Sequence, residues 1–107
     1  MEIIWHPFAS NDFDQIIYYY RDAFGVKTAQ KVRDTLHHDI YHLLCLHPFL
    51  GFCETCLSDV DQLSYRSLVS GHSKIIYTVH DKYIYIHMLW DCRRNPKQLQ
   101  SEIKERK

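Results

Sequence analysis

Four basic side chains in the second half of the chain are the strongest candidates for chemistry. Arg66, Lys74, Arg93 and Arg94 lie on or next to three runs that are rich in Ile, Val, Tyr and Thr. Guanidinium and ammonium groups hold phosphates by charge, and arginine adds paired hydrogen bonds. If the three runs are neighbouring strands, a small sheet can bring several of these cations onto one surface. The alternative is ordinary solvated charge at strand ends, beside acidic neighbours such as Asp91.

Two other groups have spacings that are typical of metal ligands. Cys53 and Cys56 have a zinc-type spacing. If residues 52–57 form a strand, however, positions three apart face opposite sides and cannot bind the same ion. His38 and His42 are four apart on a predicted helix, but no third ligand is in evident reach, and an exposed polar helix face explains them. We therefore expect packed free thiols, no metal and no cofactor.

The strands that must position the basic residues are predicted between residues 65 and 96. Ser70-Gly71 and His80-Asp81 are turn signals between the apolar runs. In residues 83–88, aromatic side chains and His87 alternate with aliphatic ones, which indicates a strand with one core face and one partly wet face. Three such strands are not stable alone in water, so helices must cover them.

The first half of the chain supplies those helices. Residues 2–6 predict a short strand beside the later three. A helix is predicted from Ser10, as N-cap, to Gly25, and a second one from Thr28 until Pro48 ends it. Residues 10–47 would then form an antiparallel helical hairpin over the sheet. Its apolar stripes are Phe13, Ile16, Ile17, Tyr20 and Phe24, then Ala29, Val32, Leu36, Ile40, Leu43 and Leu44.

The remaining segments give weaker signals. Residues 52–57 are compatible with a strand and residues 58–62 with a turn. Asn95-Pro96 is a typical helix start, and Gln98 completes a capping box. Only Leu99 and Ile103 are apolar in that last helix, so we expect it to dock by a narrow stripe or to fray.

The ordered set of runs resembles a known family. Tyr65-Arg66-Ser67-Leu68-Val69, Lys74-Ile75-Ile76-Tyr77-Thr78-Val79, and Ile84-Tyr85-Ile86 followed by Arg93-Arg94-Asn95-Pro96 are similar to the RelE/ParE superfamily. These proteins are the toxins of bacterial type II toxin–antitoxin systems. The resemblance implies one α+β domain over residues 1–107, with a small, mainly antiparallel sheet packed against an N-terminal two-helix hairpin and a short C-terminal helix.

The resemblance implies two alternative activities. RelE-like toxins cleave mRNA on the ribosome without a metal, and the match assigns the catalytic cations to Arg66, Lys74 and Arg93. ParE-like toxins inhibit DNA gyrase, and here the match assigns target binding to Arg93 and Arg94. RelE-like toxins also use a Tyr or His near the C-terminus, but neither follows Trp90 in this chain. We therefore favour the gyrase-type activity.

Three histidines keep the ribonuclease alternative open. His72, His80 or His87 can replace the missing group as a general acid or base. A third alternative is a non-toxic protein of the same fold, because one fold hosts several functions.

The resemblance also implies a partner. RelE/ParE toxins serve plasmid stabilisation or growth arrest and are neutralised by a cognate antitoxin, a flexible protein that orders as it binds. We expect it to contact the exposed Tyr18 and Tyr19 on the first helix, and Leu99 and Ile103 on the last.

Composition limits the other classes of function. The 107 residues carry thirteen basic and thirteen acidic side chains, so the formal charge is zero with histidine neutral. Strong non-specific binding to nucleic acid needs clustered Lys and Arg, which this balance disfavours. The start of the chain lacks the pattern of a signal peptide, and no apolar run reaches the ~18 residues of a membrane span. We expect a cytoplasmic protein with reduced cysteines and no membrane partner.

Overall fold

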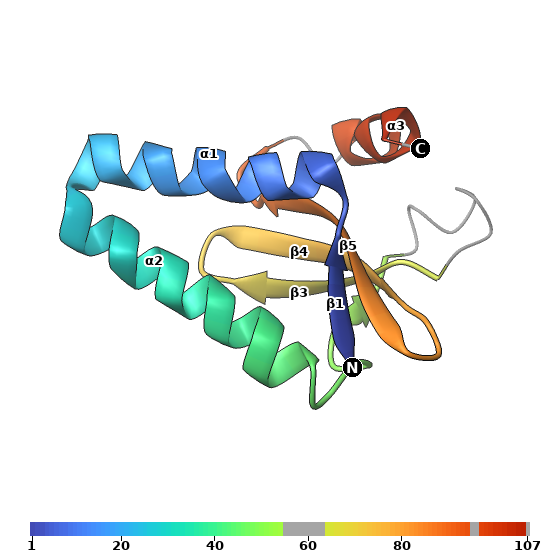
Figure 1. Ribbon diagram of the computed structural model, residues 1–107. Coiled ribbons are helices and arrows are strands. Elements are labelled where there is room, and N and C mark those ends of the chain that lie inside the picture. Colours follow the sequence, from blue (N-terminus) through green and yellow to red (C-terminus); the bar gives the residue numbers. More distant parts are fainter. Residues whose placement is uncertain (55–63, 95–96, 107) are drawn as a thin grey trace.

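A five-stranded sheet lies at the centre of the molecule (Figure 1). The computed structural model describes residues 1–54, 64–94 and 97–106. The strands run in the order β1-β5-β4-β3-β2 across the sheet. Their bounds are β1 (Glu2–Trp5), β2 (Phe52–Cys53), β3 (Arg66–Ser70), β4 (Ser73–Val79) and β5 (Tyr83–Asp91). The predicted α+β architecture is confirmed.

Strands β3, β4 and β5 form the predicted antiparallel meander. Its turns lie at the predicted places, and Gly71 in the first turn has φ +61°, a conformation that glycine adopts at low cost. Strand β1 runs parallel to β5, with Ile3 opposite Ile84. Strand β2 pairs with the outer side of β3. Of the strand predicted over residues 52–57, only Phe52–Cys53 is a strand, and the turn expected at residues 58–62 lies outside the described residues.

The first helix, α1 (Pro7–Phe24), begins three residues before the predicted N-cap. His6 caps it, because its Nδ1 accepts a hydrogen bond from the backbone N–H of Phe8. Pro7 occupies the first helical position, where its missing N–H and fixed φ are favourable. The expectation that Ser10 caps the helix was therefore wrong. The predicted end is confirmed: Gly25 has φ +98°, and its N–H donates to the carbonyl of Arg21.

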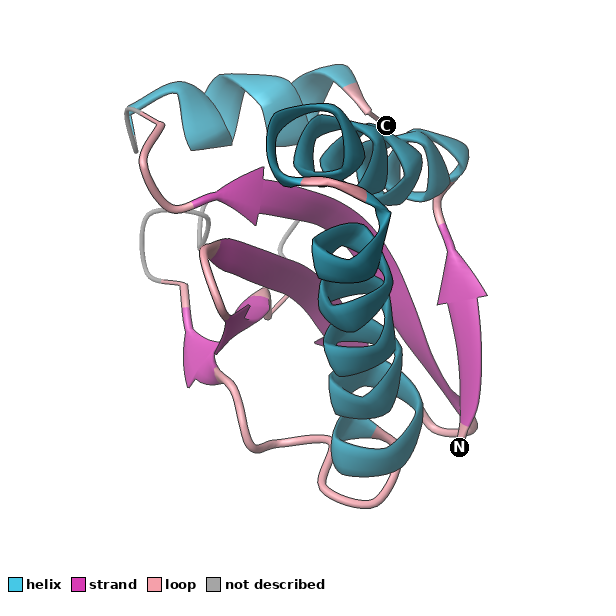
Figure 2. Ribbon diagram, turned by 90° about the vertical axis from the view of Figure 1, so that its left-hand side faces the viewer, coloured by secondary structure: helices cyan, strands magenta, loops and turns pink. Residues whose placement is uncertain are grey.

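The second helix, α2 (Val26–His38), follows Gly25 directly rather than starting at Thr28. It continues as a π-helical segment, η1 (Asp39–Leu44). Figure 2 shows α2 crossing in front of the strands. Ile40 and Leu44 are four residues apart. The wider turns of η1 help both side chains to face the sheet, in line with Leu36 of α2.

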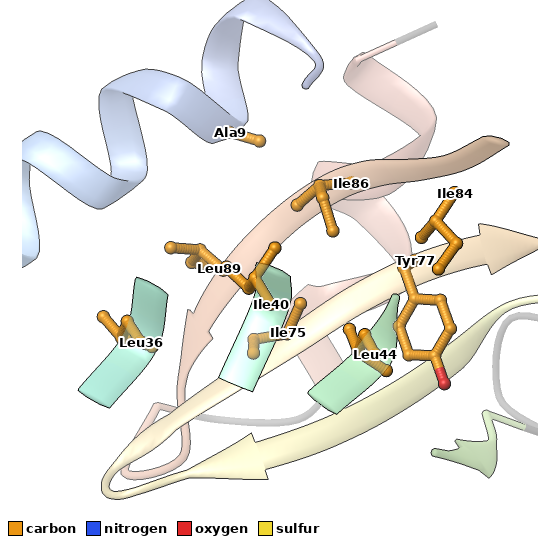
Figure 3. Packing of buried hydrophobic residues seen from close by; sticks show 9 residues of the cluster. All are labelled: Ala9, Leu36, Ile40, Leu44, Ile75, Tyr77, Ile84, Ile86 and Leu89. Carbon is orange, nitrogen blue, oxygen red and sulfur yellow. The ribbon is translucent and has the colours of Figure 1, made fainter. Parts of the chain in front are cut away.

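The main core lies between this pair of helices and the sheet (Figure 3). Leu36 and Ile40 are buried as predicted, whereas Ile16, Ile17, Val32 and Leu43 are only partly buried. Phe24 is 62% exposed at the end of α1, so its assignment to the core stripe was wrong. The cluster comprises Ala9, Leu36, Ile40, Leu44, Ile75, Tyr77, Ile84, Ile86 and Leu89.

A second, smaller core involves the last helix, α3 (Lys97–Glu105). Leu99 and Ile103 are 1% and 2% exposed and pack with Tyr65, Ile76, Met88 and Trp90. The helix therefore docks rather than frays. Its predicted start at Asn95-Pro96 lies outside the described residues. In the part of the chain that is described, no helix is both long and apolar enough to cross a membrane.

A buried tyrosine fixes the loop that leads into β2. The Tyr77 hydroxyl donates to the carbonyl of Pro48 at 2.8 Å and accepts from the N–H of Gly51 at 2.9 Å. Burial raises the pKa of Tyr77, so the hydroxyl keeps the proton that it donates. Gly51 is required by this close approach, because an added Cβ would lie 2.6 Å from the same oxygen.

We expect Tyr77→Phe to lower the free energy of unfolding by about 1–3 kcal/mol, since it leaves two backbone groups without their partner. Urea denaturation measures this loss. The exposed Tyr18→Phe is the matched control and should change stability by less than about 0.5 kcal/mol. Equal stability of the two variants would show that the Tyr77 hydroxyl does not hold the loop.

Candidate functional site

Histidine and tyrosine side chains gather on the sheet face that also carries α3. We call this set the His–Tyr face; it comprises Tyr65, Thr78, His80, Tyr83, Tyr85 and His87. The Nε2 atoms of His80 and His87 lie 2.8 and 2.9 Å from the Thr78 hydroxyl oxygen. The ring of Tyr83 stacks on His80 with centroids 4.5 Å apart, and Tyr65 and Tyr85 lie 4.9 and 4.7 Å from His87.

The shared threonine constrains the protons of both imidazoles. Its hydroxyl has one hydrogen, so it can donate to only one of the two ring nitrogens. The other nitrogen must then carry a proton and donate to the Thr78 oxygen. Two neutral histidines in complementary tautomers satisfy this arrangement, and the hydroxyl links them. Such a pair holds one proton acceptor and one proton donor side by side, as general acid–base chemistry requires.

A β-bulge at His87 places the next residue, Met88, on this same side of the sheet. Ile76 pairs with Met88, whereas the next residue, Tyr77, pairs with Ile86. His87 is therefore the extra residue of β5, and it and Met88 both project to the α3 side. Bulges commonly re-aim side chains in this way. The strict alternation predicted for residues 83–88 thus ends at His87, and Met88 packs in the second core rather than the first.

The C-terminal end of the described chain holds the backbone of the bulge. The Arg106 guanidinium donates to the carbonyl of His87 at 3.1 Å. It also binds both carboxylate oxygens of Asp12 in α1, at 2.6 and 3.1 Å. Asp12 in turn accepts from the N–H of Leu89 at 3.1 Å. These contacts connect α1, β5 and the end of α3 next to the His–Tyr face.

Arg66 and Lys74 lie on opposite faces of the sheet. Side chains of directly paired residues share a face. Arg66 pairs with Tyr77 of the main core, while Lys74 pairs with Trp90 of the second core. The sheet therefore does not bring these two of the four candidate cations onto one surface.

Both side chains are also engaged within the chain. Arg66 donates to the carbonyl of Gly51 at 2.9 Å, and its guanidinium lies 4.9 Å from the centre of the Phe49 ring. Lys74 forms an ion pair of 3.0 Å with Glu54, which also accepts from the Ser67 hydroxyl. These contacts give Arg66 and Lys74 structural roles around β2 and β3.

Arg93 follows β5 and is exposed. It binds both carboxylate oxygens of Asp91, at 3.0 and 2.8 Å, and lies 5.9 Å from the centre of the Tyr19 ring. The hydrogen bond from the Arg93 side chain holds the pKa of Asp91 below its usual value. Arg94 lies 4.2 Å above the Trp90 ring and forms an ion pair of 2.9 Å with Glu102 in α3.

We expect Arg93→Ala to raise the pKa of Asp91 toward its normal value, because the substitution removes the hydrogen bonds to the ionised carboxylate. The lowered pKa contributes stability above the unfolded-state pKa of Asp91, which is lost as the pH falls through the folded-state pKa. An NMR titration of the Asp91 carboxyl carbon measures the shift. Arg94→Ala is the matched control; equal effects of the two substitutions would contradict the geometry.

The residues expected to contact an antitoxin divide into two groups. Tyr18 and Tyr19 are 49% and 48% exposed on α1, so both are accessible. Leu99 and Ile103 are used by the second core, because α3 packs its apolar stripe onto the sheet. The expectation that these two side chains form an open docking stripe is corrected accordingly.

The residues considered as metal ligands lie away from the His–Tyr face. Cys53 is exposed, and its proposed partner Cys56 lies outside the described residues. His38 and His42 lie with ring centroids 5.5 Å apart, and His38 faces Asp39. Within the described ranges, no group of three or more His, Cys, Asp or Glu side chains is placed to hold a metal ion.

Sequence reasoning named His80 and His87 but missed their common partner. Thr78 reads as an ordinary strand residue, and it faces His87 only because β4 and β5 pair in this register. The one signal in the sequence was the partly solvent-exposed face predicted for residues 83–88, where Tyr83, Tyr85 and His87 alternate with aliphatic residues.

Comparisons with known proteins identify the fold. The sequence matches no family model, and it matches no curated protein. Solved structures do match, among them a chain titled "Chromosomal ParDE TA system from P. aeruginosa". The TM-score is 0.67, and the match covers 85% of this chain and 95% of that one, at 22% sequence identity. The fold that the RelE/ParE resemblance implied is thereby confirmed.

Proposed function

We propose that this chain is the toxin of a two-protein toxin–antitoxin module and is neutralised by a protein partner. The observation that carries the proposal is the structural likeness to a chain of a ParDE toxin–antitoxin system over nearly the whole of both molecules. The ordered strand motifs of the sequence support the same assignment.

Gyrase-type inhibition is the activity that we favour. A ribonuclease of the RelE type needs several cations around one phosphate, and two of the proposed cations, Arg66 and Lys74, are on opposite faces. Arg93 and Arg94 are adjacent and exposed after β5, where both can contact a large partner. Arginine is enriched among the residues that contribute most to protein–protein binding.

The paired substitution Arg93→Ala and Arg94→Ala tests this assignment. We expect it to weaken inhibition of purified DNA gyrase at least about tenfold in a supercoiling assay. Lys82→Ala, which removes an exposed charge in the β4–β5 turn, is the matched control and should inhibit like the parent chain. If the paired variant inhibits as well as the control, these arginines do not bind the target.

RNA cleavage is the second candidate, and the His–Tyr face favours it. Two imidazoles on one hydroxyl offer an acid and a base, and the partly exposed rings of Tyr83 and Tyr85 offer stacking surfaces for unpaired bases. Mapping RNA 5′ and 3′ ends after induced expression tests this candidate. Cleavage by 2′-hydroxyl attack would leave cyclic or 3′-phosphates.

A further inference from the structure

A trough lies between the two long helices and the β3–β4 turn. Two adjoining hollows of about 230 and 280 Å³ make it up, and Tyr20, His72 and Ser73 line both. We call their union the hairpin trough. One end is bounded by Lys31 and Thr35 of α2, and the other by Tyr19, Asp91 and Arg93.

The wall of the trough contains a buried hydroxyl without a partner. Ser70 is 6% exposed, and its Oγ has no hydrogen-bond partner among the described residues. Nearly all buried polar atoms in proteins are hydrogen-bonded, so an unpaired one in the wall of a cavity suggests a bound polar group. A hydroxyl in this position can donate to an oxygen atom.

The charges around Ser70 indicate that this group is an anion. Lys31, on the opposite wall, enters none of the ion pairs formed by the described residues. The exposed His72 lines both hollows, and its ring N–H can donate a hydrogen bond to an anion. The carboxylate that lines the trough, Asp91, is already held by Arg93 and so repels an incoming anion less.

The trough also has an apolar side. Val32 and Leu36 form part of the wall near Lys31, and Ile16 lines the other hollow. A bare phosphate would leave these side chains uncovered. A nucleic-acid backbone would need a continuous row of cations. The trough does not offer one, because Arg93 is paired with Asp91 and Lys31 lies at the opposite end.

We propose that the hairpin trough binds a carboxylate on a short apolar stem, as presented by an acidic side chain of the neutralising protein partner. The partner's identity rests on the proposed toxin function, whereas the ligand chemistry rests on the trough alone. The trough is continuous with Tyr19, one of the exposed tyrosines predicted to contact the partner.

Hexanoate is a suitable probe for the ligand chemistry, with the neutral hexanamide and inorganic phosphate as comparisons. In ¹⁵N NMR titrations of the full chain, hexanoate should give saturable shifts confined to the β3–β4 turn and the facing turns of α2. We expect hexanamide and phosphate to bind at least about fivefold more weakly. Equal binding of hexanoate and hexanamide, or tighter binding of phosphate, overturns the proposal.

Two substitutions locate the site. Lys31→Gln should weaken hexanoate binding at least about fivefold, while Lys27→Gln, one turn earlier on the same helix, should leave it unchanged. Ser70→Ala should also weaken binding without lowering stability, because the hydroxyl has no partner to lose. If the Lys31→Gln and Ser70→Ala chains both bind hexanoate like the parent chain, the carboxylate is not held in the trough.

The partner is tested separately, with the purified product of the gene beside that of this chain. Lys31→Glu places a like charge against the incoming carboxylate and should weaken the complex at least about tenfold, whereas Lys27→Glu should not. Unchanged affinity of the Lys31→Glu chain overturns the assignment to the partner. If the chain binds hexanoate but is harmless in cells, the proposed carboxylate site is supported and the proposed toxin function is refuted.

Discussion

Asp12→Ala is expected to lower the free energy of unfolding by about 3 kcal/mol. The Asp12 and Arg106 side chains are only 19% and 14% exposed, so little solvent replaces the lost contacts. The substitution removes two hydrogen bonds from the Arg106 guanidinium and one from the N–H of Leu89. Removing one partner of a largely buried pair costs several kcal/mol, because the other charge is left uncompensated. Urea denaturation measures the loss.

The matched control is Asp14→Ala, which removes an exposed carboxylate from the same helix and should cost less than about 0.5 kcal/mol. Because Arg106 holds the end of α3, we also expect Trp90 to become more exposed in the Asp12→Ala chain. A red shift of its fluorescence, relative to a Trp5→Phe background, reports this change. Equal stability of the Asp12→Ala and Asp14→Ala chains would contradict the role of the ion pair.

His87→Ala is the substitution that best separates the two activities. A positioned general acid or base contributes roughly a hundredfold to ten-thousandfold in rate. If the chain cleaves RNA on the His–Tyr face, we expect His87→Ala to slow cleavage by about a hundredfold or more. If the chain inhibits gyrase through Arg93 and Arg94, the same variant should inhibit normally, because His87 lies on the sheet and not after β5.

His37→Ala is the control for this experiment, since His37 is exposed on α2, away from the His–Tyr face. The resemblance alone predicts a similar loss of cleavage for Arg66→Ala, Lys74→Ala and Arg93→Ala. From its contacts with Gly51 and Phe49, we expect Arg66→Ala to act mainly through stability. Normal cleavage by the His87→Ala chain would exclude the His–Tyr face as the catalytic site.

Local patterns predicted the parts of the fold that depend on neighbouring residues. Turn residues and the alternation of residues 83–86 were sufficient to place β3, β4 and β5, and Gly25 marked the end of α1. The helix start was missed because histidine is an uncommon N-cap, and His6 takes that role where the chain leaves β1. Phe24 fits the helical stripe by spacing, but it is the last residue of α1 and its side chain is exposed.

The candidate site depends on contacts between distant residues, which local patterns do not contain. Arg66 and Lys74 separate onto two faces because of strand register. The bulge at His87 is a pairing irregularity without a glycine to signal it. The Asp12–Arg106 pair joins residues 94 positions apart, and only the docking of α3 brings them together.

Induced expression of this chain, alone and together with the product of the adjacent gene, tests the central claim most directly. We predict that the chain alone arrests growth, that the purified chain inhibits gyrase supercoiling, and that the neighbouring protein reverses both effects. Intact mRNA and accumulating double-strand breaks should accompany the arrest. Normal growth of cells that accumulate the folded chain, with no binding to the neighbouring protein, would contradict the toxin assignment.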